Sequence, residues 1–350
     1  MKTLRVGLGE RSYDIVCERG ILSRVGEVVA PLGRAGRKAF VLTDSNVAPL
    51  WLGKTVASLK AAGLDVSSGA LPAGEPTKRF DSLMTVYSMF AQSGLTRSDV
   101  VITLGGGVIG DLGGFAAATY LRGLDFVQVP TTLLAQVDSA VGGKVAVDLP
   151  WGKNLAGAFW QPKAVVVDPD VLDTLSDEFF SDGMAEVIKY GCIRDKGLFE
   201  RLDEAGSREK LRAHIDDVVM RCCDIKRVVV ERDERDTGER MLLNFGHTYG
   251  HALEKFYDYK KISHGAAVAV GMRTICEIAE RKGLTAPGCA AKITSLCNKY
   301  GLSCRDDAPY REVIGAIKGD KKNLNGALNV VLLHDIGDGY IYPTDGGFWL

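Results

Sequence analysis

Three of the chain's five histidines, His247, His251 and His264, fall within one short stretch. Imidazole is the commonest metal ligand in proteins and exchanges protons near neutral pH. His247 and His251 are four residues apart, so a helix places both rings on one face, and a turn could bring His264 back to that face. A lone histidine is more often a core residue, but three together in a His-poor chain favour a metal or proton-transfer site.

A carboxylate for such a site lies in the segment 183–189. Glu186 and Lys189 are three residues apart, so they share a helix face and could form an ordinary surface ion pair. Their neighbours are apolar, which predicts instead that Glu186 points inward, where a carboxylate needs a cation. Two or three imidazoles holding a divalent metal would supply that cation. A His-His-carboxylate set with open coordination positions is typical of catalytic metal sites.

A glycine-rich turn follows the apolar run that ends at Leu104. The turn, Gly105 to Gly110, fits Gly-x-Gly-x-x-Gly between a predicted strand and a predicted helix. Such glycines permit a tight turn and let backbone amides approach a pyrophosphate at a helix N-terminus. The alternative is a close-packed turn without a ligand. Because the turn follows an internal strand, we expect a Rossmann-like domain with a non-standard strand order, and we prefer Asp44 over Asp125 as the ribose acceptor.

Lysines beside glycines form a third feature. Lys144 follows Gly142 and Gly143, and Lys153 follows Gly152. Because glycine weakens helices, these lysines are not expected to decorate a helix surface. They could hold a phosphate or a carboxylate, the alternative being solvated loop lysines. Further basic candidates, which alone would be interpreted as surface charges, are Lys226, Arg240, Lys321 and Lys322.

The first half of the chain alternates short apolar runs with helical stretches. β-Branched runs bounded by Gly, Pro or Asp predict buried parallel strands at 38–44, 99–104, 125–130 and 164–168. A hairpin is expected around 2–8 and 11–17, and 79–92 can form a crossover helix. This pattern predicts an α/β domain over residues 1–175, with a parallel sheet covered on both faces.

After about residue 175 strand-like runs nearly vanish. Helical periodicity continues through 183–203, 207–230, 241–257, 265–282, 287–300 and 309–318, and a strand pair is expected at 328–333 and 339–342. We therefore predict a mostly α-helical second domain over residues 176–350. Two domains without a flexible linker favour ligand binding in a cleft between them.

The composition is that of an ordinary globular protein, with 350 residues, 46% hydrophobic residues and a formal net charge of -1. This charge gives no reason to expect nucleic acid or an anionic membrane as a partner, and no apolar run is long enough to cross a bilayer. None of the eight cysteines forms a Cys-x-x-Cys pair, and the N-terminus carries no apolar signal segment. We expect reduced thiols and a cytoplasmic protein.

Several of these stretches together resemble the 3-dehydroquinate synthase family, in the sugar phosphate cyclase superfamily. The matching stretches are Gly105 to Asp111, Tyr120 to Asn154, Gly183 to Lys189, Asp233 to Glu254, His264-Gly265 and Asp320-Lys321-Lys322. The long central run and the Gly-His-Thr-x-Gly-His-Ala element are far more specific than a glycine motif.

The resemblance implies a role for each matching residue. Glu186, His247 and His264 correspond to ligands of a divalent metal, usually Zn2+ or Co2+, whereas the position of His251 contacts substrate and assists proton movement. Arg122 corresponds to an arginine that reaches the neighbouring subunit's site, which implies a homodimer. Substrate-pocket positions match Asp138, Lys144, Asn154, Lys189, Lys226, Arg240, Asn244 and one of Lys321 and Lys322. Positions that contact NAD match Asp44, Asn46, Glu75, Lys78, Gly106, Gly107, Val108, Asp111, Thr131, Thr132, Lys153 and Thr174.

The implied activity is that of a carbon–oxygen lyase of the shikimate pathway, which leads to aromatic amino acids. It converts 3-deoxy-D-arabino-heptulosonate 7-phosphate to 3-dehydroquinate and phosphate by transient NAD-dependent oxidation, β-elimination, re-reduction and intramolecular aldol closure. Two positions depart from the family pattern. Asp236 replaces the usual Glu with a shorter side chain, and Ser176 replaces a common Pro, which should loosen that turn.

Three other functions stay open on the sequence. Another sugar phosphate cyclase would act on sedoheptulose 7-phosphate or glucose 6-phosphate, but Asn244, His251 and Lys226 occupy positions that tend to differ where the substrate lacks a carboxylate. A metal-dependent polyol dehydrogenase would share the two-domain plan and accumulate NADH. A non-catalytic NAD-binding sensor would release no phosphate.

Overall fold

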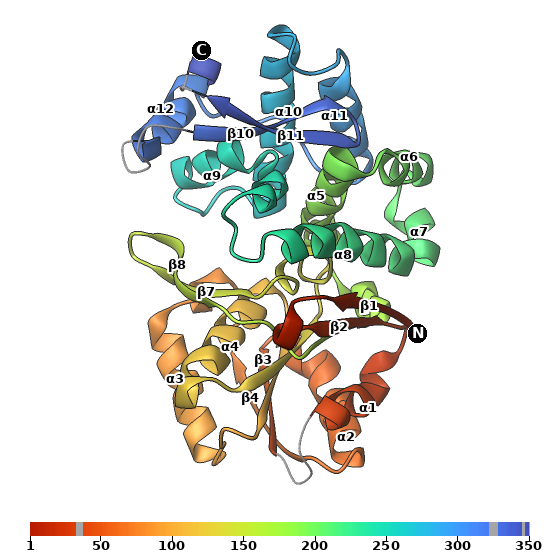
Figure 1. Cartoon of the computed structure of the whole chain (residues 1–350), viewed down its shortest axis with the longest axis vertical. Coiled ribbons are helices and arrows are strands. Elements are labelled where there is room, and N and C mark those ends of the chain that lie inside the picture. Colours follow the sequence, from red (N-terminus) through yellow and green to blue (C-terminus); the bar gives the residue numbers. More distant parts are fainter. Residues whose placement is uncertain (33–37, 322–327, 345–346, 350) are drawn as a thin grey trace. The chain divides into compact units, whose positions relative to one another are not determined.

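The chain forms two compact units, Met1–Leu175 and Ser176–Leu350. In Figure 1 the first unit runs from red to yellow-green and the second from green to blue. The computed structural model describes residues 1–32, 38–321, 328–344 and 347–349, without the side chains of 318–321 and 328. Within these ranges, every helix is too short or too polar to span a bilayer.

The first unit is an α/β structure built on one large sheet. The strands of this unit are β1 (Lys2–Val6), β2 (Tyr13–Cys17), β3 (Lys38–Asp44), β4 (Asp65–Leu71), β5 (Val100–Gly105), β6 (Asp125–Pro130), β7 (Lys144–Leu149), β8 (Gly152–Phe159) and β9 (Ala164–Val167), of which β7 and β8 form a separate pair. Its α-helices are α1 (Val25–Val29), α2 (Gly53–Ala61), α3 (Phe80–Gln92) and α4 (Gly107–Thr119). The sheet has the order β1-β2-β9-β6-β5-β3-β4, in which β1 and β2 are antiparallel and the other neighbours are parallel. The strand order therefore differs from the standard dinucleotide-binding order, as the position of the glycine turn predicts.

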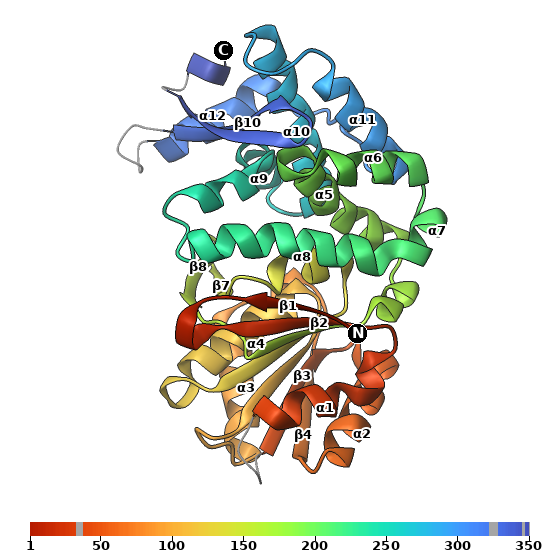
Figure 2. The same ribbon diagram turned by 45° about the vertical axis from the view of Figure 1, so that its right-hand side comes forward.

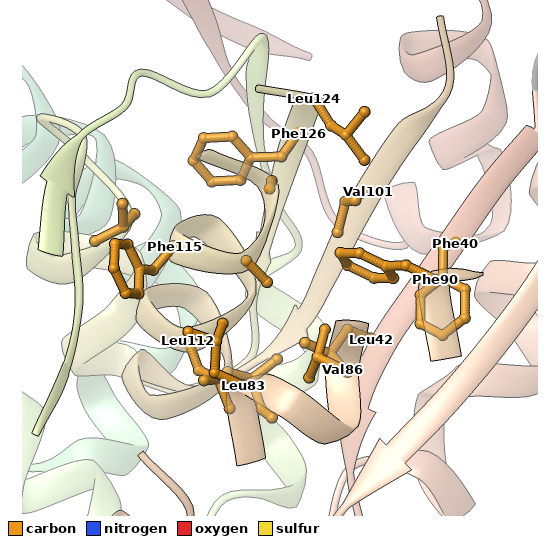
Figure 3. Packing of buried hydrophobic residues seen from close by; sticks show 14 of the residues in the cluster. Phe40, Leu42, Leu83, Val86, Phe90, Val101, Leu112, Phe115, Leu124 and Phe126 are labelled. Carbon is orange, nitrogen blue, oxygen red and sulfur yellow. The ribbon is translucent and has the colours of Figure 1, made fainter. Parts of the chain in front are cut away.

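Both faces of this sheet are buried, because its central strands carry apolar side chains on both faces. In β3, Phe40 and Leu42 join one hydrophobic cluster, whereas Ala39 and Val41 join the cluster on the opposite face. Figures 1 and 2 show α3 and α4 on one side of the sheet and α1 and α2 on the other. Figure 3 shows the first cluster, where Phe40 packs edge-to-face on Phe90 with ring centroids 5.1 Å apart.

Two strand regions lack the apolar pattern that predicts the central strands. β4 is an edge strand with the largely polar sequence Asp-Val-Ser-Ser-Gly-Ala-Leu, so it lacks the apolar run that marks central strands. The segment 144–159, in which lysine and glycine suggest a loop, is the antiparallel hairpin of β7 and β8. Val145 and Val147 of this hairpin belong to the cluster that α4 covers.

The second unit is mainly helical. Its helices are α5 (Asp177–Arg194), α6 (Lys196–Ala205), α7 (Arg208–Leu211), α8 (Ile215–Arg232), α9 (His247–Phe256), α10 (His264–Arg281), α11 (Cys289–Lys299) and α12 (Tyr310–Lys321). An antiparallel hairpin, β10 (Leu328–Asp335) and β11 (Asp338–Thr344), packs on α5 and α10. Helix α10 also contacts α5, α9 and α11, so it forms the centre of this unit (Figure 1).

Short polar caps divide the predicted helical segments. The segment 183–203 is two helices, because Asp195 ends α5 and caps α6 by accepting a hydrogen bond from the Leu198 amide at 2.9 Å. Ser176 caps α5 by accepting a hydrogen bond from the Phe179 amide at 3.4 Å. The serine thus supplies a helix cap at the turn where the family's common proline is absent.

Candidate active site

Three helices of the second unit bring one carboxylate and two imidazoles together. Glu186 lies in the middle of α5, and His247 and His264 are the first residues of α9 and α10. Oε1 of Glu186 lies 3.4 Å from Nε2 of His247 and 3.6 Å from Nε2 of His264. The ligand atoms of all three residues lie within 4.8 Å of one another. These three residues are the metal ligands that the resemblance to the family implies.

The chemistry of these three groups fits a divalent cation. Glu186 is 1% exposed, and within the described residues its Oε1 has no partner in hydrogen-bonding geometry. Two ligand atoms bound to one tetrahedral zinc ion lie about 3.4 Å apart, which is close to the separations observed here. Three protein ligands also leave a coordination position for a substrate oxygen.

The two oxygens of Glu186 face different partners. Oε2 forms a buried ion pair with the Lys189 ammonium, whereas Oε1 faces the two histidines. Burial alone would raise the pKa of Glu186, but Lys189 and then His247 hold it well below its usual range. The carboxylate is therefore charged, as a metal ligand must be. Burial also opposes the charged form of His264, yet Glu186 and Glu254 raise the pKa of His264 to about 10.

His251 borders this cluster. It is exposed, and its ring centroid lies 5.3 Å from that of His247 and 6.0 Å from that of His264. The ligand atoms of His251, Glu254 and His264 form a second set within 4.8 Å of one another. His251 is thus placed beside the first set and not within it.

Glycines allow α9 and α10 to approach closely enough to join the two histidines. A Cβ on Gly271 of α10 would lie 2.0 Å from the carbonyl oxygen of Gly246, which precedes His247. At the start of α10, a Cβ on Gly265 would lie 2.2 Å from the carbonyl oxygen of Asp182 in α5. The Asp182 carboxylate also accepts a hydrogen bond from the Gly265 amide at 2.6 Å. These contacts fix where His247 and His264 begin their helices.

Gly271→Ala is expected to separate the two histidines and weaken metal binding at least tenfold. Overpacking of this kind costs about 1–3 kcal/mol of unfolding free energy, because the new methyl group meets backbone that cannot turn aside. Urea denaturation and titration of the metal-free protein with Zn2+ would measure both effects. Gly315→Ala is the matched control, since this replacement on α12 would place its Cβ more than 4 Å from the atoms of the described residues outside that helix. Unchanged zinc affinity in Gly271→Ala would show that this approach does not set the site.

Three polar side chains implied as substrate contacts lie on other elements of the same unit. Lys226 on α8 is 5% exposed, and Arg240 on the 3-10 turn η10 (Glu239–Asn244) is 2% exposed. From their sequence context alone, these two residues would be expected on the surface, but the structure buries both of them. Asn244, which ends η10, is exposed. Lys321 ends α12, but its side chain, like the whole of Lys322, lies outside the described residues.

Asp233 organises the loop that carries Arg240. Its carboxylate accepts hydrogen bonds from the backbone amides of Thr237, Gly238 and Arg240. Although partial burial opposes the charge, these bonds lower the pKa of Asp233 to about 2. The Arg240 guanidinium donates to the Glu234 carbonyl at 2.7 Å. Asp236, the shortened family position, adopts a left-handed backbone (φ 59°) in this loop.

The first unit gathers many of the implied NAD contacts at the carboxyl ends of its parallel strands, where open α/β sheets bind ligands. β5 ends at Gly105, and Gly106 is the N-cap of α4. A Cβ on Gly106 would lie 3.0 Å from Thr132, which follows the end of β6. The neighbouring Thr131 amide donates to the Gly105 carbonyl at 2.9 Å. Gly107 and Val108 begin α4, so their amides lie in its first turn, where a helix favours negative charge.

A group of charged residues lies near this turn. The Lys78 ammonium donates to the Asp111 carboxylate at 2.5 Å, and Lys153 lies 3.9 Å from Glu75. Burial opposes the charge of Lys78, but Asp111 and Glu75 outweigh it and raise the pKa of Lys78. Burial raises the pKa of Glu75, against the opposing effect of Lys78 and Lys153. These four implied NAD contacts thus form one electrostatic group with Asp148.

Asp44 and Asn46 lie at the end of β3. The buried Asp44 carboxylate accepts hydrogen bonds from the amides of Asn46 and Val47, at 2.9 and 3.0 Å. Asp44 therefore shapes this turn as well as occupying the strand-end position that predicts a ribose contact. Thr174, the remaining implied NAD contact, ends the 3-10 turn η8 (Pro169–Thr174) and donates to the Val171 carbonyl at 2.9 Å.

The implied substrate contacts of the first unit lie on η7 and the β7–β8 hairpin. Asp138 is on η7 (Ala135–Ser139), and Lys144 is the exposed first residue of β7. Asn154 has a left-handed backbone (φ 57°), and its amide donates to Asp148 at 2.8 Å. Arg122 is exposed at the end of η6 (Tyr120–Arg122), also with a positive φ of 67°. The turn thus presents Arg122 to solvent.

Family models for the N-terminal and C-terminal parts of 3-dehydroquinate synthase match residues 68–182 and 183–323. A 3-dehydroquinate synthase of Clostridium botulinum is 51% identical over 100% of both chains. The chain belongs to the 3-dehydroquinate synthase family. A member from Streptococcus gordonii is 44% identical over 97% of this chain and 96% of its own.

Solved structures share the fold at lower identity. A 2-deoxy-scyllo-inosose synthase complexed with carbaglucose-6-phosphate, NAD+ and Co2+ aligns with a TM-score of 0.88 over 99% of this chain and 98% of that chain, at 23% identity. A 2-epi-5-epi-valiolone synthase from Streptomyces hygroscopicus, with NAD+ and Zn2+ bound, aligns with a TM-score of 0.87 over 96% and 94%, also at 23% identity. A probable glycerol dehydrogenase from Sinorhizobium meliloti aligns with a TM-score of only 0.58. The predicted fold class, a Rossmann-like domain plus a helical domain, is thus confirmed.

Proposed function

We propose that this protein is a 3-dehydroquinate synthase that converts 3-deoxy-D-arabino-heptulosonate 7-phosphate to 3-dehydroquinate and phosphate. Membership of the family supports this activity. The observation that carries it is the convergence of His247 and His264 on the buried, charged Glu186. The related synthases with bound NAD+ and Co2+ or Zn2+ support the same two cofactors here.

The metal would be held by Glu186, His247 and His264. When bound, the metal would polarise the substrate hydroxyl, and NAD would take up a hydride and return it later in the same cycle. Lys189 holds the second oxygen of Glu186, so it orients the carboxylate while its charge stays beside the site. His251 is exposed beside the cluster, where it can exchange a proton with a bound substrate.

Basic residues would hold the two anionic ends of the substrate. Lys226 and Arg240 are buried within the unit that carries the proposed metal ligands. We include Asn244, Asp138, Lys144 and Asn154 as further substrate contacts, and one of Lys321 and Lys322. Fixing both ends of a flexible substrate converts binding energy into orientation, which can supply much of the rate enhancement.

NAD would bind at the strand ends of the first unit. The amides of Gly106, Gly107 and Val108 can receive the pyrophosphate at the N-terminus of α4. The remaining proposed contacts are Asp44, Asn46, Glu75, Lys78, Asp111, Thr131, Thr132, Lys153 and Thr174. We also propose a cytoplasmic homodimer in which Arg122 reaches the partner subunit, since its turn exposes the side chain.

Purified protein given the heptulosonate phosphate, NAD+ and Co2+ is expected to release phosphate without net formation of NADH. The hydride is returned within each turnover, so NAD is needed only in catalytic amount. Phosphate and NADH absorbance should be followed in the same reaction, with chelator as the control that stops turnover until metal is restored. Net NADH would indicate a polyol dehydrogenase. Phosphate from sedoheptulose 7-phosphate or glucose 6-phosphate alone would indicate another cyclase, and NAD binding without phosphate release would indicate a sensor.

A further inference from the structure

The carboxylate of Glu254 is buried but has no role in the proposed reaction. Glu254 lies on α9, seven residues after His247, so two helical turns place the two side chains on one face. It is 3% exposed. Because a buried carboxylate is costly without a donor or a cation, its partner is informative. Oε1 of Glu254 lies 3.7 Å from Nδ1 of His264.

The two candidate metal-binding imidazoles are oriented in the same way. His247 directs Nε2 toward Glu186 and Nδ1 toward the Phe245 carbonyl oxygen, at 3.1 Å. His264 directs Nε2 toward Glu186 and Nδ1 toward Glu254. An acceptor at Nδ1 keeps the proton on that nitrogen and leaves the lone pair of Nε2 for a metal. For His247 the acceptor is backbone, whereas for His264 it is a side chain that can be changed.

We propose that Glu254 is a positioning residue: it accepts the Nδ1–H of His264 and holds Nε2 toward the metal position beside Glu186. This inference rests on the proposed metal site. Acceptors of this kind fix the ring and increase the basicity of the ligating nitrogen.

A second metal site at His251, Glu254 and His264 is the competing interpretation, because these ligand atoms also lie within 4.8 Å of one another. It would require the single ring of His264 to bind two cations, one at each nitrogen. His251 is also exposed, whereas the set with Glu186 is built on a carboxylate that is 1% exposed. The geometry therefore favours Glu254 as the acceptor of a proton and not as a ligand.

Glu254→Gln is expected to weaken Co2+ binding to the metal-free protein about 10–100-fold and to change the visible absorption spectrum of bound Co2+. The amide is neutral and can donate to Nδ1, which would favour the wrong tautomer of His264. Glu280→Gln is the matched control. Its carboxylate accepts a hydrogen bond from the Ala290 amide at 2.7 Å, so its loss would lower the melting temperature without changing Co2+ affinity or spectrum.

The titration separates this inference from the metal site itself. Wild-type protein that binds no Co2+ would overturn both. One ion per chain in wild type, with equal affinity and spectrum in Glu254→Gln, would overturn only the role of Glu254. Two ions per chain, one of them lost in both Glu254→Gln and His251→Ala, would establish the second site instead. If Glu254→Gln does not fold, Glu254→Asp should show an intermediate loss of affinity, and wild-type affinity there would contradict the proposal.

Discussion

Glu186→Gln is expected to yield protein without bound divalent metal and without phosphate release. Glu186 supplies a negative charge beside both His247 and His264, and the residue is 1% exposed, so solvent does not replace that charge. A glutamine has the same shape but no charge to offset a divalent ion in a buried position. Elemental analysis of the purified variant measures the metal directly, and an undiminished metal content would contradict the assignment.

This variant also leaves the Lys189 ammonium buried without its carboxylate. Removing one partner of a buried pair costs about 3–5 kcal/mol, so Glu186→Gln should melt well below wild type. The double variant Glu186→Gln/Lys189→Met removes both charges and is expected to recover much of that stability. Because the double variant still lacks the carboxylate, it should remain free of metal. Loss of metal in both variants separates ligation from stability.

The sequence predicts the central strands of the sheet because both of their faces are buried. The segments 38–44 and 125–130 coincide with β3 and β6, whose apolar residues face both sides of the sheet. β4 could not be predicted in this way, because an edge strand needs fewer apolar residues. The β7–β8 hairpin was not predicted, because it contains glycines and lysines, which have low strand propensity.

The candidate metal site could be predicted in part from local sequence. The apolar neighbours of Glu186 correctly indicate a buried carboxylate. The spacing of the histidines cannot rank His251 against His264, since a shared helix face does not specify which ring meets a carboxylate on another helix. The structure places His264 beside Glu186 because α10 begins there. The choice of His264 as a ligand came from the resemblance to the family and not from the spacing of the histidines.

Supporting residues are the part that the sequence does not reveal. Asp182, Asp233 and Glu254 each act on a group in another turn or helix, and no local pattern marks them. Asp182 lies one turn before Glu186, yet its partner is the amide of Gly265. Such pairings depend on the packing of distant segments. The predicted cleft between the two halves stays a prediction.

Lys144→Ala is expected to lower phosphate release about 10²–10³-fold while the protein remains folded. Lys144 follows two glycines with positive φ, Gly142 (96°) and Gly143 (66°), which fix the direction in which β7 begins. Its side chain is exposed, so truncation should change the unfolding free energy by less than about 0.5 kcal/mol. Steady-state phosphate release and urea denaturation would measure the two quantities. Wild-type turnover would remove Lys144 from the mechanism.

Lys163→Ala is the matched control for the lost charge. Lys163 lies in the same unit, 3.7 Å from Asp125, and its side chain is 43% exposed. Its removal changes the net charge by the same amount and should leave phosphate release unchanged. A similar loss of activity in both variants would mean that overall charge, and not a contact of Lys144, attracts the anionic substrate.

Co-expression of Lys144→Ala with Arg122→Ala then tests the proposed homodimer. If Arg122 completes the partner's site, a dimer with one chain of each kind has one site in which both residues are intact. Mixed dimers purified through two different tags should therefore regain about half of wild-type activity, although each variant alone is nearly inactive. Absence of recovery in mixed dimers would show that Arg122 acts within its own chain. Recovery would show that each active site needs residues of two chains, so activity would depend on dimer formation.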